Sequence, residues 1–191
     1  MPSDTLTLGI DTSAAHCAAA LLSGDRVLAS CAETMTRGQA ERLMPLIQEM
    51  LSVAGVDWSD LSRIGVGVGP GNFTGIRVGV SAARGLALAL DVPAIGVSGF
   101  EVIADGDASG RAVVPAPQGQ FYALEAGRPV LLPESAFTGE RLAHLPDPAE
   151  MAIAVARCAQ KGEADAVPLY VKPAEAAPPR DTPPEIVDDP V

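Results

Sequence analysis

Three polar residues, Asp11, Thr12 and Ser13, directly follow an apolar segment, Thr5 to Ile10, and could bind a phosphorylated ligand. A carboxylate at such a place can hold a hydrated metal ion, and hydroxyls with neighbouring backbone N–H groups can bind phosphate oxygens. The same residue types also stabilise turns through local hydrogen bonds. The sequence leaves both interpretations open and favours a turn that binds no ligand.

A glycine-rich segment, residues 69–79, is the second candidate. It reads Gly-Pro-Gly-Asn-Phe-Thr-Gly-Ile-Arg-Val-Gly and joins an apolar strand, residues 64–68, to a helix predicted to end near Leu90. Glycine and proline favour a turn here. We expect Thr74 to cap the helix and Phe73 to anchor the loop in the core. A phosphate-binding P-loop would end in Gly-Lys-Ser/Thr, and this segment does not.

The helix after this loop has a small residue at every fourth position: Gly75, Gly79, Ala83 and Ala87. Side chains four apart share a helix face, so this face is almost bare backbone. It fits either a core helix lying on a sheet or a helix in close contact with a partner protein. Arg77 and Arg84 argue against a membrane-spanning helix.

Residues for metal or nucleophilic chemistry are sparse and scattered. His16 and His144 lie far apart in the sequence, and Cys17, Cys31 and Cys158 form no Cys-x-x-Cys pair. Neither a His-Glu-x-x-His zinc motif nor a Gly-x-Ser-x-Gly nucleophile motif occurs. The sequence therefore predicts no catalytic residue and no metal site, with the histidines in surface or turn positions and the cysteines reduced and buried.

Composition narrows the function classes further. The chain has 191 residues, 48% of them hydrophobic, and a formal net charge of -11. This acidic balance argues against direct nucleic-acid binding, which needs a basic surface, and the few aromatic residues are too dispersed to stack bases. The N-terminus has no signal-peptide pattern, and no run of 18 apolar residues occurs. We expect a soluble cytoplasmic protein without a membrane partner.

The order of the predicted elements indicates a mixed α/β fold. Three strands with a hairpin precede a helix over Gln39–Ala54, and a strand, a helix and a strand follow. Pro45 should kink the first helix or mark a restart in it. This order is that of an actin-like, hexokinase-like (ribonuclease H-like) domain. We predict a first subdomain over 1–104, a short second subdomain over 105–172, and a disordered, acidic, proline-rich tail over 173–191.

Three separated motifs resemble the TsaB (YeaZ) family in the right order over about residues 4–100. They are Leu8–Ser13, Ala40–Pro45 and Gly69–Gly79, and the segment Pro168–Lys172 is similar to the family's C-terminal segment. The loop motif is carried by Gly69, Pro70, Gly71, Phe73, Thr74, Gly75 and Arg77. The resemblance implies the same actin-like (ASKHA) fold, here with a shortened second subdomain.

The resemblance also implies a non-catalytic subunit in threonylcarbamoylation of the adenosine next to the tRNA anticodon. Its implied partners are the transferase TsaD, the ATPase TsaE and, functionally, TsaC; a homodimer is the alternative pairing, and the isolated chain is not expected to bind tRNA or a cofactor. Any nucleotide would sit at a composite site with partners. TsaD-like enzymes carry two metal-binding histidines on the helix equivalent to Gln39–Ala54, and this chain has none there.

The partner interface is expected on two helices of the first subdomain. Its expected residues are Leu43, Ile47, Met50, Gly75, Gly79 and Ala83. One departure from the family is Pro115-Ala116-Pro117, which stands where the family has Asp-Ala-Arg, so a role for that carboxylate is not carried over. The competing hypotheses are a stand-alone actin-like ATPase and a glycoprotease-type metallopeptidase.

Overall fold

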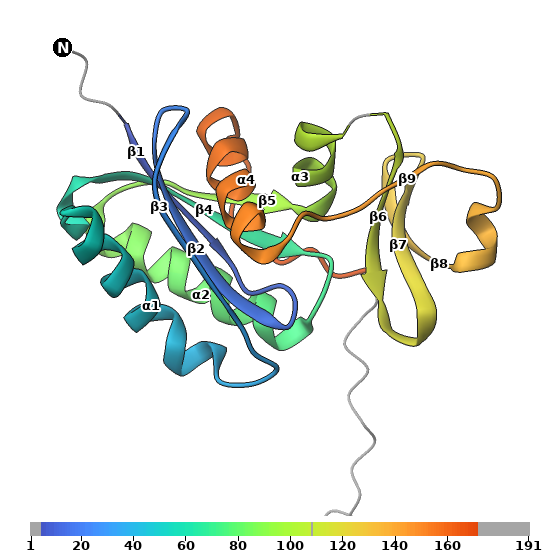
Figure 1. Ribbon diagram of the computed structural model, residues 1–191, viewed down its shortest axis with the longest axis horizontal. Coiled ribbons are helices and arrows are strands. Elements are labelled where there is room, and N and C mark those ends of the chain that lie inside the picture. Colours follow the sequence, from blue (N-terminus) through green and yellow to red (C-terminus); the bar gives the residue numbers. More distant parts are fainter. Residues whose placement is uncertain (1–4, 108, 172–191) are drawn as a thin grey trace, which may run out of the picture.

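Two β-sheets organise the chain (Figure 1). The computed structural model describes residues 5–107 and 109–171. The larger sheet has the order β3-β2-β1-β4-β5, with β1 (Leu6–Asp11), β2 (His16–Ser23), β3 (Arg26–Thr34), β4 (Leu61–Gly69) and β5 (Ala94–Ser98). β1 to β3 pair antiparallel, whereas β4 and β5 continue the sheet in parallel. The carboxyl ends of β1 and β4 are therefore neighbours, which brings the two sequence motifs together.

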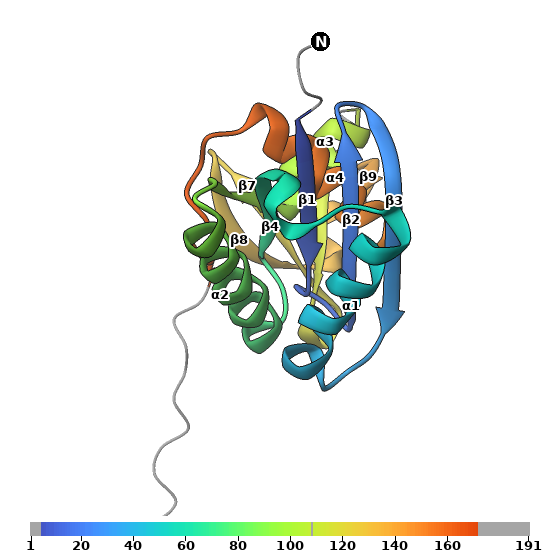
Figure 2. The same cartoon turned by 90° about the vertical axis from the view of Figure 1, so that its left-hand side faces the viewer.

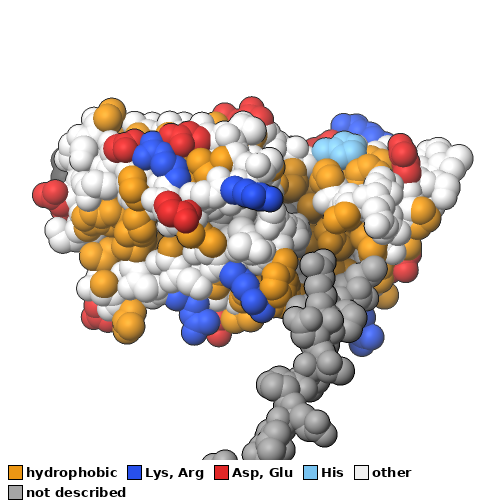
Figure 3. Space-filling view, turned by 90° about the horizontal axis from the view of Figure 1, so that it is seen from below, with side chains coloured by type: hydrophobic (Ala, Val, Ile, Leu, Met, Phe, Trp, Pro, Cys, Tyr) orange, Lys and Arg blue, Asp and Glu red, His pale blue; other side chains and the backbone are white. Residues whose placement is uncertain are grey.

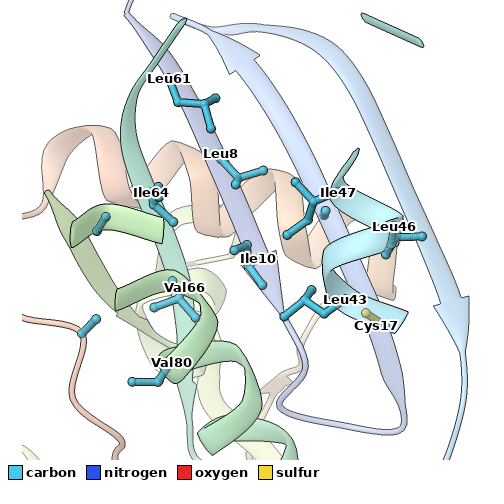
Figure 4. Packing of buried hydrophobic residues seen from close by; sticks show 14 of the residues in the cluster. Leu8, Ile10, Cys17, Leu43, Leu46, Ile47, Leu61, Ile64, Val66 and Val80 are labelled. Atoms are coloured by element: carbon cyan, nitrogen blue, oxygen red, sulfur yellow. The ribbon is translucent and has the colours of Figure 1, made fainter. Parts of the chain in front are cut away.

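Helices cover both faces of this sheet, as Figure 2 shows. α1 (Gln39–Ala54) and α2 (Phe73–Leu90) pack on one face, and α4 (Pro148–Lys161) packs on the other. Figure 4 shows Leu43 and Ile47 of α1 pointing toward Leu8 and Ile10 of β1 in the larger core. α1 ends at Ala54, and the residue that follows it, Gly55, has a φ of 66° that suits glycine.

Pro45 lies inside α1, and the helix does not restart there. The helix runs without a break from residue 39 to residue 54 with Pro45 inside it. A proline there removes the hydrogen bond to the carbonyl of Glu41, and both residues are exposed, so water can bind that carbonyl instead.

The sheet face that packs against α4 carries almost no side chains where the helix crosses it. A Cβ on Gly9 would overlap the carbonyl oxygen of Ala152, and a Cβ on Gly65 would lie 2.6 Å from the Cβ of Ala159. Glycine on the strands and alanine on the helix thus allow an unusually close approach. Arg63 fixes the helix end by donating hydrogen bonds of 2.7 and 2.9 Å from Nη1 to the carbonyls of Ala159 and Gly162.

The smaller sheet has the order β8-β7-β6-β9 and lies beside α3 (Gly99–Gly106). Its strands are β6 (Arg111–Ala116), β7 (Gln120–Glu125), β8 (Arg128–Pro133) and β9 (Leu142–Ala143), and the short 3-10 turns are Trp58–Asp60, Pro117–Gly119 and Glu134–Phe137. The predicted second subdomain, 105–172, needs correction because α4 returns to the five-stranded sheet and Leu169 packs on its core. The predicted tail, 173–191, lies outside the described residues.

α2 is the one helix in the described part of the chain that is long and apolar enough, with a mean hydropathy of 1.3, to pass a length-and-composition test for a membrane span. It carries Arg77 and Arg84, and one of its faces packs against β4. Its apolar character is therefore explained by its place in an α/β core.

Arg42 links α1 to the edge strand β3, and this link should depend on pH. Its guanidinium donates hydrogen bonds to both Glu33 and Glu49, which lowers the pKa of each carboxyl below its ordinary value. The stabilisation is fully present above pH 4.5, the ordinary pKa of glutamate, and disappears as the pH falls through the lower pKa values of the folded state.

We expect Arg42→Gln to lower the melting temperature modestly at pH 7 and to have a smaller effect at pH 3. An equal loss at both pH values would contradict this.

Candidate functional site

The turn after β1 and the glycine-rich loop bind each other. The Thr12 hydroxyl donates a 2.7 Å hydrogen bond to the carbonyl of Gly75, and the Asn72 backbone N–H donates a 2.7 Å bond to the carbonyl of Ser13. Asp11, Thr12 and Ser13 are all buried. These three residues, which we considered as a nucleotide-binding turn, therefore hold the glycine-rich loop and the start of α2 in place.

The two glycines of the small-residue face of α2, Gly75 and Gly79, are explained by this contact. A Cβ on Gly75 would overlap the carbonyl oxygen of Thr12, and a Cβ on Gly79 would lie 2.6 Å from the Thr12 hydroxyl. A Cβ on Gly71 would likewise overlap the carbonyl of Ser13. The bare face thus makes room for the chain's own turn, the first of the two interpretations that the spacing allowed.

The predicted partner-interface residues need correction for the same reason. All six are buried within the chain: Leu43, Ile47, Met50, Gly75, Gly79 and Ala83. They face the five-stranded sheet because they form the apolar stripe of each amphipathic helix, and that stripe has its place in the chain's own core. A partner would have to contact the outer faces of α1 and α2.

The start of α2 also differs from the prediction. Asn72, not Thr74, caps the helix: its side chain accepts a 2.9 Å hydrogen bond from the Gly75 backbone N–H. Phe73 lies outside the core, with 36% of its surface exposed. Its ring packs on that of Tyr170 and lies 3.9 Å from the Arg77 guanidinium, so these three side chains tie the C-terminal segment to α2.

Asp11 and His16 form a buried pair that the sequence did not reveal. His16 Nε2 lies 2.5 Å from Asp11 Oδ2, which also accepts a 3.0 Å hydrogen bond from the Ser13 hydroxyl. The expectation that His16 is a surface or turn residue is therefore wrong. Asp11 Oδ1 has no hydrogen-bond partner among the described residues and lies against the backbone of Gly67, where a Cβ would overlap it.

A cavity of about 520 Å³ opens between the two sheets beside this pair. Asp11, Ser13 and His16 line one side, His144 and Tyr122 line the other, and prolines supply much of the wall. The two histidines, 128 positions apart in the sequence, thus face one cavity. His16 lies at the start of β2 and His144 lies in the connection between β9 and α4. Only the fold brings these two segments together, so the spacing of the histidines in the sequence did not indicate it.

The cavity walls offer little for phosphate or metal chemistry. No lysine or arginine is among the described residues that line it. Within residues 5–107 and 109–171, no group of three His, Cys, Asp or Glu side chains is placed to hold a metal ion. Burial raises the pKa of the Cys17 and Cys158 thiols to about 11, so at neutral pH these side chains are thiols and not nucleophilic thiolates.

A second concave surface lies on the outer side of α1 and α2. It is a groove of about 390 Å³, lined by Ala40, Leu43, Met44, Thr74, Arg77, Val78, Ser81 and Ala82, and we call it the helix groove. Met44 is 39% exposed there. Figure 3 views the molecule from the side of these helices and shows hydrophobic side chains interspersed with charged ones.

Comparison with known proteins identifies the family. The family model for TsaD, tRNA N6-adenosine threonylcarbamoyltransferase, matches residues 27–175. The chain is 38% identical over 99 residues to the tRNA threonylcarbamoyladenosine biosynthesis protein TsaB of Escherichia coli K12, and 37% identical over 122 residues to TsaB of Bacillus subtilis 168. The chain belongs to the TsaD family and, within it, to the TsaB (YeaZ) group. The resemblance of the three motifs is thereby confirmed.

The matched segments cover 52% of this chain and 42% of the E. coli relative, and 60% of this chain and 52% of the B. subtilis relative. The chain thus spans about half the length of these curated relatives. The structure of YeaZ from Pseudomonas aeruginosa is similar over 87% of this chain and 99% of that chain, with a TM-score of 0.68 and 27% identity. The predicted actin-like, hexokinase-like α/β fold is confirmed.

Proposed function

We propose that this chain is a non-catalytic subunit of tRNA threonylcarbamoyladenosine synthesis that binds a TsaD transferase and activates it in the cytoplasm. The name of the TsaB relatives supports the pathway, and the match to the TsaD family model supports a common fold with the proposed partner. The adenosine next to the tRNA anticodon is the substrate of the assembly. TsaE and TsaC take part in the same reaction sequence, whereas the isolated chain does not bind tRNA.

The helix groove is the observation that carries this proposal. Leu43, Ile47 and Met50 are used inside the chain, so the outer faces of α1 and α2 are what a partner can reach. The lining of this groove combines the apolar Met44 and Val78 with the exposed Arg77. An apolar centre with a polar rim is the usual composition of an interface that forms between separately folded proteins.

The described cavity walls support a subunit that does not carry the transferase chemistry. Transfer of a threonylcarbamoyl group from an adenylate needs groups that stabilise phosphate and developing negative charge, and these are usually cations or a metal ion. The cavity beside Asp11 and His16 has no cationic lysine or arginine among its described lining residues. We therefore propose that TsaD contains the active site and that this chain provides a surface that binds TsaD.

A pair of matched variants on α1 tests the helix groove. Met44 is 39% exposed inside the groove, whereas Val53 is 87% exposed on the same helix outside it. We expect Met44→Asp to weaken binding of purified TsaD at least tenfold, because it buries an unpaired charge in the interface, and Val53→Asp to leave the affinity unchanged. Calorimetric titration measures both affinities, and thermal unfolding shows that both variants are folded.

The same variants can be tested for function. In a mixture of TsaD, TsaC, TsaE, threonine, bicarbonate, ATP and tRNA, the wild-type chain should restore formation of the modified adenosine, and Met44→Asp should lower its initial rate to the extent that binding is lost. No restoration by the wild-type chain would contradict the proposed function. Equal binding by both variants would contradict the helix groove alone. Hydrolysis of ATP by the isolated chain would instead favour the stand-alone ATPase.

A further inference from the structure

The outer face of α2 is basic in a chain whose overall charge is acidic. The helix carries two arginines, Arg77 and Arg84, and no acidic residue, whereas the whole chain has 24 acidic and 13 basic residues. Two helical turns separate the two arginines, so they lie on one face of the helix, and both are exposed. Neither forms an ion pair with a carboxylate among residues 5–107 and 109–171, whereas four other arginines do. This face therefore offers positive charge to an acidic ligand.

An acidic segment of the same chain begins beside this face. The hydroxyl of Tyr170 accepts a 2.9 Å hydrogen bond from Arg77 Nε, and the ring of Tyr170 packs on that of Phe73, with 4.9 Å between the ring centroids. Residue 171, the last one that the structure describes, is therefore held near the first turns of α2. Between positions 173 and 191 the sequence has five acidic residues and one arginine. The charge of this segment, which we call the acidic segment, is thus complementary to that of the outer face of α2.

The helix groove has a composition that matches part of the acidic segment. In Glu185–Asp189 two apolar β-branched residues, Ile186 and Val187, stand between acidic residues. The groove is lined by apolar side chains together with Arg77, and its described lining residues include no carboxylate. An apolar pair flanked by carboxylates therefore fits a groove that combines apolar area with a guanidinium.

The acidic segment is long enough to reach the groove and the far end of α2. The 18 residues of α2 span about 27 Å at 1.5 Å per residue. The fifteen residues from 172 to 186 can extend over as much as about 50 Å at 3.3 Å per residue. Since the segment starts at one end of this helix, chain length does not prevent the contact.

Tethering makes weak contacts sufficient. Exposed ion pairs are individually weak, and salt weakens them further. A segment of the same chain, however, is present near its site at an effective concentration on the order of millimolar. A contact with a dissociation constant in that range is therefore formed about half of the time. Two arginines and an apolar groove can supply such a contact.

We propose that the acidic segment, residues 173–191, binds the outer face of α2 in its own chain. Its carboxylates lie against Arg77 and Arg84, and Ile186 and Val187 occupy the helix groove. One consequence, which rests on the proposed function, is that the segment competes with TsaD for that groove. The chain then regulates its own availability to the partner.

A charge-neutral variant of the full chain tests the contact without any partner. It combines Glu175→Gln, Asp181→Asn, Glu185→Gln, Asp188→Asn and Asp189→Asn. We expect the amide NMR signals of residues 74–85 to shift relative to the wild type, and those of α4, on the other face of the sheet, to stay in place. In the wild type, 0.5 M sodium chloride should move the same signals toward their positions in the variant.

Two results of this NMR comparison would overturn the proposal. Unchanged signals over residues 74–85 would show that the acidic segment does not bind α2. Shifts that grow with protein concentration would show that the segment binds a second copy and not its own chain.

A pair of arginine variants tests the contact from the other side. Arg84→Gln removes one of the proposed partners, and Arg128→Gln removes an arginine that is exposed on β8. We expect the amide signals of residues 181–189 to shift in Arg84→Gln and not in Arg128→Gln. Equal shifts in both variants would overturn the proposal, because the segment would then respond to overall charge and not to α2.

Titration with TsaD separates this proposal from the proposed function. The charge-neutral variant should bind TsaD at least threefold more tightly than the wild type, because the groove is then free for a larger fraction of the time. Equal affinity of the two chains would overturn the placement of the segment in the helix groove. Failure of both chains to bind TsaD would contradict the proposed function, and the NMR signals of residues 74–85 would still decide whether the segment binds α2.

Discussion

Gly75→Ala is expected to lower the free energy of unfolding by about 3 kcal/mol, because the added methyl group must displace backbone and not a flexible side chain. Its Cβ would overlap the carbonyl oxygen of Thr12, and the carbonyl of Gly75 itself accepts the Thr12 hydroxyl hydrogen bond. Relief of the overlap would move the β1 turn away from α2 and lengthen that bond. Urea unfolding of the purified chain measures the change.

Two other glycines of the same helix provide the controls. Gly85 has no atom within 4 Å of its would-be Cβ, so Gly85→Ala should raise the free energy of unfolding by about 0.5–1 kcal/mol through helix propensity alone. Gly79→Ala should fall between the two, because its Cβ would meet Thr12 Oγ1 at 2.6 Å and a side chain gives way more readily than backbone. A stabilising or neutral Gly75→Ala would mean that α2 does not pack as tightly on the turn as described.

The order of these stability changes shows whether α2 serves as a core helix or as a partner-binding helix. A helix built for partner contact would tolerate alanine at Gly75 and Gly79 in the isolated chain and lose only binding. A helix built for its own core loses stability first. The two variants therefore also distinguish the two interpretations of the four-residue spacing, and the burial of Gly75 and Gly79 already favours the core helix.

Local features were predictable from the sequence where one segment determines its own structure. The strands around Ser23-Gly24-Asp25, the end of α1 at Gly55, and the Asp147 cap with Pro148 in the first turn of α4 all follow from short-range turn and helix rules. The fold class followed from the order of these elements together with the family motifs.

Features that depend on distant segments were not predictable. The periodicity of α1 and α2 identifies an apolar stripe on each helix, but it does not say whether the sheet or a partner covers that stripe. Our interface prediction placed a partner there, whereas the sheet covers it. His16 and Asp11 lie across a hairpin turn, five positions apart, a spacing without a recognised motif. His144 joins them only because α4 returns to the first sheet, which the predicted boundary at residue 104 did not allow.

Asp11→Ala should be as costly as Gly75→Ala, about 3 kcal/mol, because it leaves buried partners without their acceptor. Asp11 is fully buried, and its Oδ2 contacts both His16 Nε2 and the Ser13 hydroxyl. Removing the carboxylate leaves His16 and Ser13 with polar atoms that water reaches poorly. Asp25→Ala in the exposed β2–β3 turn is the matched control and should change the stability by less than about 0.5 kcal/mol.

A double-mutant cycle shows whether the loss belongs to the pair. If the Asp11–His16 contact carries it, His16→Ala should cost less in the Asp11→Ala background than in the wild type, with a coupling of about 1–3 kcal/mol. Additive losses would mean that Asp11 acts through Ser13 and the turn alone. Because the Thr12 hydroxyl bond to Gly75 lies in the same turn, Asp11→Ala should also loosen the start of α2. Faster amide exchange at residues 75–77 than in the Asp25→Ala control would show that the turn, the glycine-rich loop and the buried pair form one structural unit.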